Sequence, residues 1–152
     1  MLFRSMTLCV LSLFLFTGCY SQFKTHDPDA EAVVQKLVDT IVSGQRSQIA
    51  EMVSLPFWMD KWHTDLESVR AKLGGNEGGP KAVKMKLRLF PLSELAVRKP
   101  ILWQELQEAD PTWLADVVLA EMTLELNGKT EVGLLFLRKV GTQWRLAGLV
   151  EQ

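Results

Sequence analysis

The chain has 152 residues, with 17 basic and 18 acidic side chains, so its formal net charge is −1 at pH 7. Domains that bind nucleic acid usually show a strong basic excess on one face, and such an excess is absent overall. We therefore expect no nucleic-acid partner. The length suits a single domain with a core of its own.

The first residues have the pattern of a secretory signal peptide. Residues 1–4 form a short positive start, residues 6–16 are an uncharged apolar run, and the small residues Thr17 and Gly18 follow. A retained transmembrane helix is the weaker interpretation, because crossing a bilayer takes about 20 apolar residues. We expect residues 1–18 to be removed as a signal peptide.

The segment Phe16-Thr17-Gly18-Cys19 resembles the bacterial lipobox, in which a peptidase cuts just before a cysteine that carries diacylglycerol. Phe16 stands where that family prefers leucine. The resemblance implies a diacylglyceryl cysteine at Cys19, with fatty acyl chains such as palmitate that anchor the protein stably. Tyr20, rather than aspartate, follows the cysteine and resembles an outer-membrane address. The expected location is the bacterial cell envelope, lipid-anchored at the outer membrane and facing the periplasm.

Cysteine usage agrees with lipidation. Cys9 lies inside the leader, so Cys19 would be the single cysteine of the mature chain. A lone thiol is reactive in an oxidising compartment unless it is blocked, and lipid would block it. The alternative is that Cys19 is an ordinary cysteine after a conventional cleavage site.

After the leader we expect a lipidated tether over residues 19–26 and a single α+β domain over residues 27–152. Asp27-Pro28 is typical of a helix start, and apolar residues at helical spacing extend to Val42, before Gly44 ends the helix. This apolar stripe has to pack against a large partner within the fold.

Two shorter helices are expected next. One covers residues 47–53 and stops at Ser54-Leu55-Pro56, because proline disfavours helix before it. Another follows Thr64-Asp65-Leu66-Glu67, which fits a capping box, and ends at Gly74-Gly75. The glycine-rich residues 74–80 are interpreted as a flexible surface loop, since no Gly-Lys-Ser/Thr follows to make a phosphate-binding loop.

The sequence after this loop alternates with a period of two. Apolar residues from Val83 to Leu89 alternate with Lys84, Lys86 and Arg88, as in a half-buried strand. The basic row could meet anionic lipid head groups or an anionic envelope polymer, although a solvated face is the simpler interpretation. Further on, residues 100–109 are expected to form a short helix.

The last third of the chain predicts an antiparallel meander. A strand over residues 114–126 leads to Asn127-Gly128, the favoured type I′ hairpin dipeptide, and a second strand covers residues 130–140. A turn at Gly141-Thr142 leads into a third strand over residues 143–150. We expect the apolar face of this sheet to cover the first helix, which makes the fold class α+β.

These features together resemble the nuclear-transport-factor-2-like superfamily, with its cystatin-like cone. The residues that carry the resemblance are Leu55-Pro56-Phe57, after the early helices, and the closing strand with Trp144. The resemblance implies a curved antiparallel sheet around the long helix, with a pocket at the open end of the cone. Some members are enzymes, such as ketosteroid isomerase and scytalone dehydratase, and many are binding modules.

The supply of catalytic side chains is small. The mature chain has His26, His63 and one tyrosine, Tyr20, which lies beside the anchor, so an isomerase-like oxyanion hole lacks its tyrosine. A dehydratase-like set could use Asp60, His63 and Asp65, but Asp65 is more simply a residue that favours a helix start. No catalytic residue is therefore predicted. No cofactor or metal site is predicted either, because two distant histidines without cysteines do not make a zinc site.

The aromatic residues near His63 are the best candidates for binding. Phe57, Trp58, Asp60, Trp62 and His63 could line a pocket or contact a partner. Trp113 and Trp144 are interpreted as core residues on strands.

The sequence thus predicts a noncatalytic envelope lipoprotein that contacts the membrane through Cys19 and binds a small apolar ligand or an envelope protein. One alternative is an enzyme of isomerase, dehydratase or hydrolase type on the same fold. Another is an accessory lipoprotein of secretion or envelope assembly. The sequence makes no prediction of oligomeric state.

Overall fold

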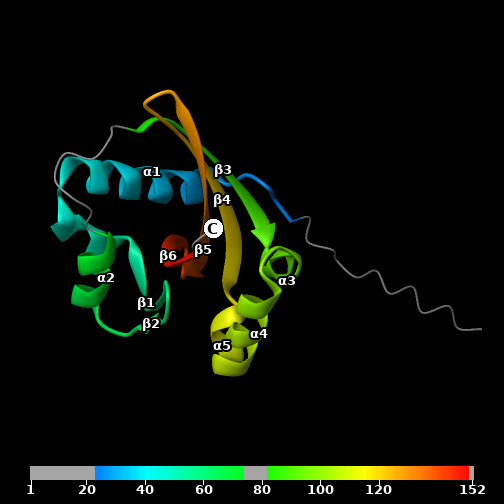
Figure 1. Cartoon of the computed structure of the whole chain (residues 1–152). Helices are drawn as coiled ribbons and strands as arrows, with labels where there is room; N and C mark the ends of the chain where they lie inside the picture. Colours follow the sequence, from blue (N-terminus) through cyan, green and yellow to red (C-terminus); the bar gives the residue numbers. More distant parts are fainter. Residues whose placement is uncertain (1–22, 74–81, 151–152) are drawn as a thin grey trace, which may run out of the picture.

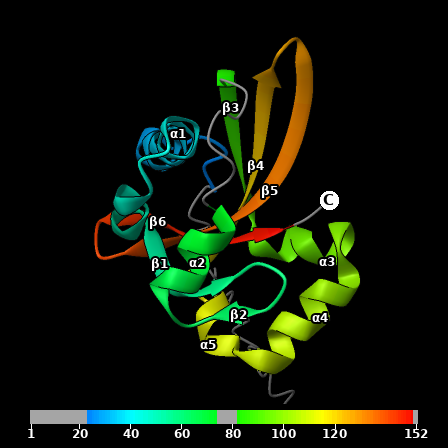
Figure 2. The ribbon, with the colours of Figure 1, turned by 60° about the vertical axis from the view of Figure 1, so that its left-hand side comes forward.

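A six-stranded sheet forms the centre of the fold, with helices against both of its faces (Figures 1 and 2). The computed structural model describes residues 23–73 and 82–150. The predicted signal peptide, Cys19 and the glycine-rich segment 74–80 lie outside the described residues. In chain order the elements are α1 (Pro28–Ser43), the 3₁₀ helix η1 (Arg46–Glu51), β1 (Val53–Trp58), β2 (Trp62–His63), α2 (Leu66–Leu73), β3 (Ala82–Pro91), the 3₁₀ helix η2 (Leu92–Glu94), α3 (Leu95–Arg98), α4 (Pro100–Ala109), α5 (Pro111–Leu114), β4 (Val117–Leu126), β5 (Lys129–Val140) and β6 (Gln143–Val150).

The strand order in the sheet is β2-β1-β6-β5-β4-β3, so the sheet is open, with β2 and β3 at its edges. β1 and β6 are parallel, whereas the other neighbouring pairs are antiparallel. At the β3 edge the amide of Leu89 donates a hydrogen bond to the carbonyl of Thr25 (2.8 Å), so the segment before α1 lies along this strand. The α+β prediction is confirmed at this level.

The first helix agrees with its sequence pattern. The carboxylate of Asp27 accepts hydrogen bonds from the amides of Asp29 (3.0 Å) and Ala30 (3.2 Å), and Pro28 occupies the first helical position. Gly44 ends the helix with φ 72°, a left-handed conformation that glycine adopts without steric cost. The apolar face packs on the sheet beside β3 and β6, as predicted.

The predicted helix over residues 47–53 is confirmed only up to residue 51, and as a 3₁₀ helix. The segment forms η1 and then enters β1 at Val53, and the amide of Leu146 in β6 donates to the carbonyl of Met52 (2.7 Å). Pro56 is tolerated within β1, after a cis Leu55–Pro56 bond, because the β1–β6 register shifts between Val53 and Trp58. At such an irregularity the strand does not need a ladder bond from every amide.

Two other boundaries differ from the predictions. α2 starts with Asp65 as its cap, whose carboxylate accepts hydrogen bonds from the amide (2.8 Å) and hydroxyl (2.7 Å) of Ser68, so the Thr64 capping box is placed one residue too early. Leu114 ends α5, and β4 starts only at Val117. Pro111 explains the second difference, because proline suits the first turn of a helix, and Asp110 caps that turn.

The hairpin and the meander are confirmed. Asn127 and Gly128 both have positive φ, 49° and 76°, as a type I′ turn requires. β3 has the predicted alternation, with Leu87 and Leu89 buried and Lys84, Lys86 and Arg88 exposed.

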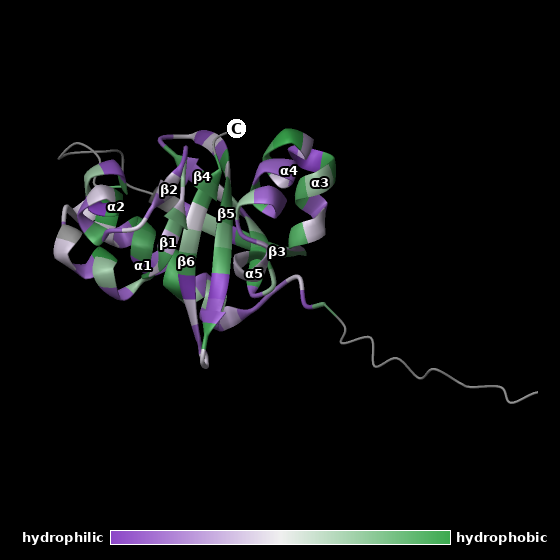
Figure 3. Cartoon of the chain, turned by 90° about the horizontal axis from the view of Figure 1, so that it is seen from below, coloured by the Kyte–Doolittle hydropathy of each residue, from purple (hydrophilic) through white to green (hydrophobic). Residues whose placement is uncertain are grey.

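The sheet separates two apolar clusters. One lies between the sheet and α1 with α2, and contains Leu135 and Leu137 of β5. The other lies under α3, α4 and α5, and contains Leu134 and Phe136 of the same strand. Figure 3 shows the apolar strands between the two groups of helices. Trp113 is buried as predicted, but it lies in α5 rather than on a strand.

Candidate functional site

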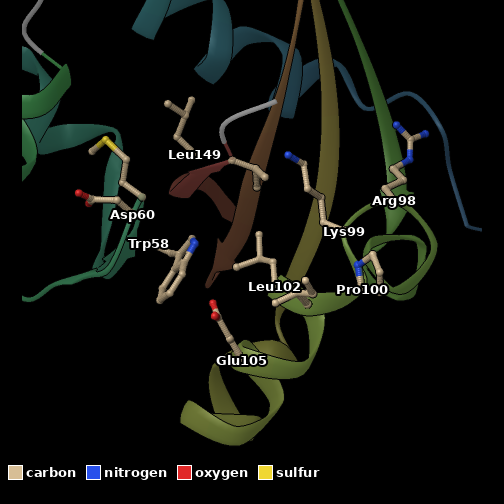
Figure 4. Close-up of a pocket in the computed structure, with 11 residues that line it drawn as sticks. Trp58, Asp60, Arg98, Lys99, Pro100, Leu102, Glu105 and Leu149 are labelled. Carbon is tan, nitrogen blue, oxygen red and sulfur yellow. The ribbon is translucent and has the colours of Figure 1, made fainter.

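A groove of about 450 Å³ opens between the turn that joins β1 to β2 and the helices α3 and α4 (Figure 4). The last residues of β6 lie at its base, where Leu149 and Val150 extend past the final β1–β6 pair, Trp58 with Gly148. The lining residues are Trp58, Met59, Asp60, Arg98, Lys99, Pro100, Ile101, Leu102, Glu105, Leu149 and Val150.

The β1–β2 turn supplies one wall of the groove. The amide of Met59 donates to the carbonyl of Lys61 (3.1 Å), which closes the turn and leaves Trp58 and Asp60 in the lining. In Figure 4 the Trp58 indole lies opposite Leu102 and Glu105 of α4. The groove therefore has an apolar centre between charged groups, the usual composition of a binding site.

Asp60 is held by two partners. Its carboxylate lies 3.1 Å from Nε2 of His63 and 3.4 Å from Nζ of Lys72. The hydrogen bond with His63 lowers the pKa of Asp60, and the charge of Lys72 acts in the same direction. His63 is buried, with 4% of its side chain exposed, whereas 46% of the Asp60 side chain is exposed. Only the aspartate of this pair reaches the groove.

Four aromatic rings connect the turn to the core behind it. Successive pairs are edge-to-face: Trp58 with Trp62 at 5.1 Å between centroids, Trp62 with Trp113 at 4.9 Å, and Trp113 with Phe136 at 5.4 Å. The Trp113 indole also donates to the carbonyl of Pro56 (3.3 Å). Edge-to-face contacts of this kind add stability beyond area burial, so the wall that carries Trp58 is fixed by the core.

The opposite wall comes from α3 and α4. Arg98 forms an ion pair with Glu121 of β4 (2.8 Å) and stacks over the ring of Phe90, 4.3 Å from its centroid. Beside it, Val97 and Ile101 are 81% and 77% exposed. Val97 lies in α3 and Ile101 in α4, and two large apolar side chains exposed on either side of this helix junction mark a surface suited to contact with a partner.

The five predicted site residues do not all meet in one place. Trp58 and Asp60 line the groove. Trp62 lies behind this wall. Phe57 points to the other face of the sheet, into the α1 cluster, and the buried His63 is its register partner on β2. Sequence reasoning missed the α3–α4 wall, although Ile101 gave a signal: it lies outside the apolar stripe of Leu102 and Leu106.

Metal ligands do not gather in the described parts of the chain: within residues 23–73 and 82–150, no three side chains of histidine, cysteine, aspartate or glutamate could hold a metal ion. Among the same residues, no helix is long and apolar enough to cross a membrane.

Comparison with known proteins does not define a family. No family model matches the chain. A tRNA/tmRNA (uracil-C(5))-methyltransferase of Acinetobacter baylyi (strain ATCC 33305 / BD413 / ADP1) is 31% identical over 88 residues. The match covers 57% of this chain but spans only 24% of the length of that enzyme.

Proposed function

We propose that this protein is a noncatalytic, membrane-anchored lipoprotein of the bacterial envelope that binds a partner protein in the groove between the β1–β2 turn and α4. The observation that carries the binding proposal is the exposure of Val97 and Ile101 beside a groove that is centred on Trp58. The anchoring proposal depends on the leader and on Cys19.

A partner protein is favoured over a small apolar ligand because the apolar surface continues out of the groove. A small ligand would be enclosed by the pocket, whereas Ile101 both lines the groove and is mostly exposed. Protein interfaces typically have an apolar centre with a polar rim, and tryptophan is among the residues that contribute most of the binding energy there. A small apolar ligand is the second candidate for the same groove.

We further infer that the domain belongs to the nuclear-transport-factor-2-like superfamily. The long helix α1 packed inside a strongly bent sheet, together with the long closing hairpin, supports this assignment (Figure 2). In that superfamily the pocket at the end of the cone serves enzymes and binding modules alike. The side chains at the site therefore decide between them.

The enzyme alternative depends on Asp60 and His63, which form a hydrogen bond. General acid–base chemistry requires the histidine ring to be within reach of the substrate, but His63 is buried and is absent from the groove lining. The pair is better explained as a brace that joins the β1–β2 turn to α2 through Lys72. An accessory role in secretion or envelope assembly is a more specific form of the binding proposal, with an envelope complex as the partner.

One expression experiment in a Gram-negative host tests both parts of the proposal. Wild-type protein is expected to incorporate labelled fatty acid and to fractionate with the outer membrane, whereas Cys19→Ser does neither. A photo-crosslinking residue in place of Leu102 is expected to join the protein to one defined envelope protein. Introducing Ile101→Glu should reduce that crosslink about tenfold or more, since it places a charge in the apolar contact.

The matched control is Val132→Glu, which adds the same charge at an exposed valine of β5, 42% exposed and away from the groove. It should leave the crosslink unchanged. Equal labelling of wild type and Cys19→Ser contradicts anchoring, and a crosslink insensitive to Ile101→Glu contradicts the binding site. A small apolar molecule retained by the purified protein, with no crosslinked partner, would favour the second candidate.

A further inference from the structure

The edge strand β3 carries a positively charged face beside the point where the chain enters the domain. Lys84, Lys86 and Arg88 are exposed on the same side of this strand. No ion pair among the described residues involves Lys84 or Lys86. We call this surface, together with Lys24, the β3 basic face.

The acidic groups nearby do not cancel this charge. Register pairing places Glu121 opposite Arg88 and Glu125 opposite Lys84 on β4. Glu121 is already occupied by Arg98 at 2.8 Å, which leaves Glu125 as the acidic β4 partner of the three basic side chains on β3. The whole chain is slightly acidic, at −1, so the β3 basic face has the opposite sign to the molecule as a whole.

The segment before α1 lies against the same strand. The hydrogen bond from the Leu89 amide to the Thr25 carbonyl fixes residue 25 at the outer edge of β3 (Figure 1). Phe23 and Lys24 precede it and are both exposed. Six residue steps separate Thr25 from Cys19, and an extended chain spans at most about 3.5 Å per step, so a lipid at Cys19 would lie within about 21 Å of this edge.

We propose that the β3 basic face lies against the anionic phospholipid head groups of the membrane that holds the anchor; this orientation rests on lipidation of Cys19 under the proposed function. Basic side chains next to an anionic surface are attracted to it over a Debye length, about 8 Å at physiological salt. The acidic remainder of the molecule is repelled, so the orientation is selected by charge.

The test uses the purified, full mature protein in vesicles that contain phosphatidylglycerol and a nitroxide head-group quencher. Thr123→Cys, opposite Lys86 on β4, takes a fluorophore on the β3 basic face, and Ser47→Cys takes the same fluorophore at an exposed position of η1. Quenching is expected at position 123 and not at position 47. It should be lost in about 1 M salt, where the Debye length falls to about 3 Å.

Charge reversal supplies the matched comparison. The double variant Lys84→Glu with Lys86→Glu should abolish the quenching at position 123. The control is the double variant Lys36→Glu with Lys61→Glu, which changes the net charge by the same amount outside the β3 basic face and should preserve the quenching. Mass spectrometry shows whether Cys19 carries lipid, and vesicle flotation shows whether the protein is bound to the vesicles, both independently of the quenching. Protein that lacks lipid overturns both the anchoring proposal and this orientation. Lipid-bearing protein with equal quenching at both positions, or with quenching unaffected by Lys84→Glu and Lys86→Glu, overturns the orientation alone.

Discussion

β6 approaches β1 closely at Gly148. A Cβ atom at this position would lie 2.6 Å from the carbonyl oxygen of Trp58 and 2.6 Å from a ring carbon of Phe136. Both distances are shorter than any ordinary contact, and one of the two neighbours is backbone, which cannot move aside alone. The absence of a side chain at residue 148 therefore sets the position of Trp58 in the groove.

We expect Gly148→Ala to destabilise the fold by about 1–3 kcal/mol, because extra volume in a packed interior forces the neighbouring strands apart. Thermal unfolding followed by circular dichroism measures the loss. Gly133→Ala is the matched control on β5, since its new methyl group would lie 3.5 Å from the flexible end of Met122. Equal melting temperatures for the two variants would show that β1 and β6 are not in close contact at residue 148.

The sequence located part of the site at the residue scale. Trp58 and Asp60 were predicted as site residues, and both line the groove. They were predictable because they belong to one short stretch of the sequence that is rich in aromatic and polar residues. Phe57 was assigned to the same site, but successive strand residues point to opposite faces, and the sequence does not specify which face is which. The α3–α4 wall comes from a segment about 40 residues later, and only the tertiary fold brings it to Trp58.

At the scale of elements, two short helices start from aspartate carboxylates. The amide and then the hydroxyl of Ser68 donate to Asp65 and lower its pKa. The Thr112 hydroxyl and then the Trp113 amide do the same for Asp110. A folded pKa below the unfolded value means that each carboxylate contributes its full stability above the unfolded pKa, about 3.9, and loses it as pH falls through the folded pKa.

The double variant Asp65→Asn with Asp110→Asn should therefore change the acid response of the protein. Asparagine keeps an oxygen that accepts the capping hydrogen bonds but does not titrate. The melting temperature at pH 7 should remain near that of wild type, and its decline below about pH 4 should become shallower. Melting curves between pH 2 and pH 7 test this, with Asp29→Asn, an exposed aspartate that caps no helix, as the control. Parallel declines for the double variant and wild type would contradict it.

Elements with strong local signals were predictable. Asp27-Pro28 and Gly44 bound α1 as expected, and Asn127-Gly128 makes the expected turn. The point where η1 gives way to β1 was not predictable, because a short apolar stretch fits either helix or strand. Its pairing with β6 decides the outcome, and that pairing joins residues far apart in the sequence.

On the scale of the whole molecule, the sheet is shared by two cores. Leu135 packs toward α1, whereas its neighbour Phe136 packs against Trp113 of α5. Both clusters are built on side chains of the same strands, so loss of one cluster removes packing that holds those strands in place for the other. The fold should therefore unfold as one unit.

Truncation of either face is expected to lower the stability of the whole protein. Leu135→Ala should cost about 2–5 kcal/mol and Phe136→Ala about 3–5 kcal/mol, through lost burial and the cavity left behind. Denaturant unfolding is followed by tryptophan fluorescence, which comes mainly from the α5 side, since four of the five tryptophans pack there and only Trp144 packs on the α1 cluster. It is also followed by far-ultraviolet circular dichroism, which reports all helices. In both variants the two transitions should coincide. Separate midpoints would show that the two faces unfold independently.

The position of β6 also has a consequence for the order of events during biogenesis. β6 comes after every other strand in the chain, yet it lies in the middle of the sheet and is the strand that joins β1 and β2 to the remaining three. The sheet cannot be completed until residues 143–150 have been synthesised. A nascent chain therefore keeps β1 and β2 apart from the β3–β5 meander until this late point, and the fold closes only when β6 is added between them.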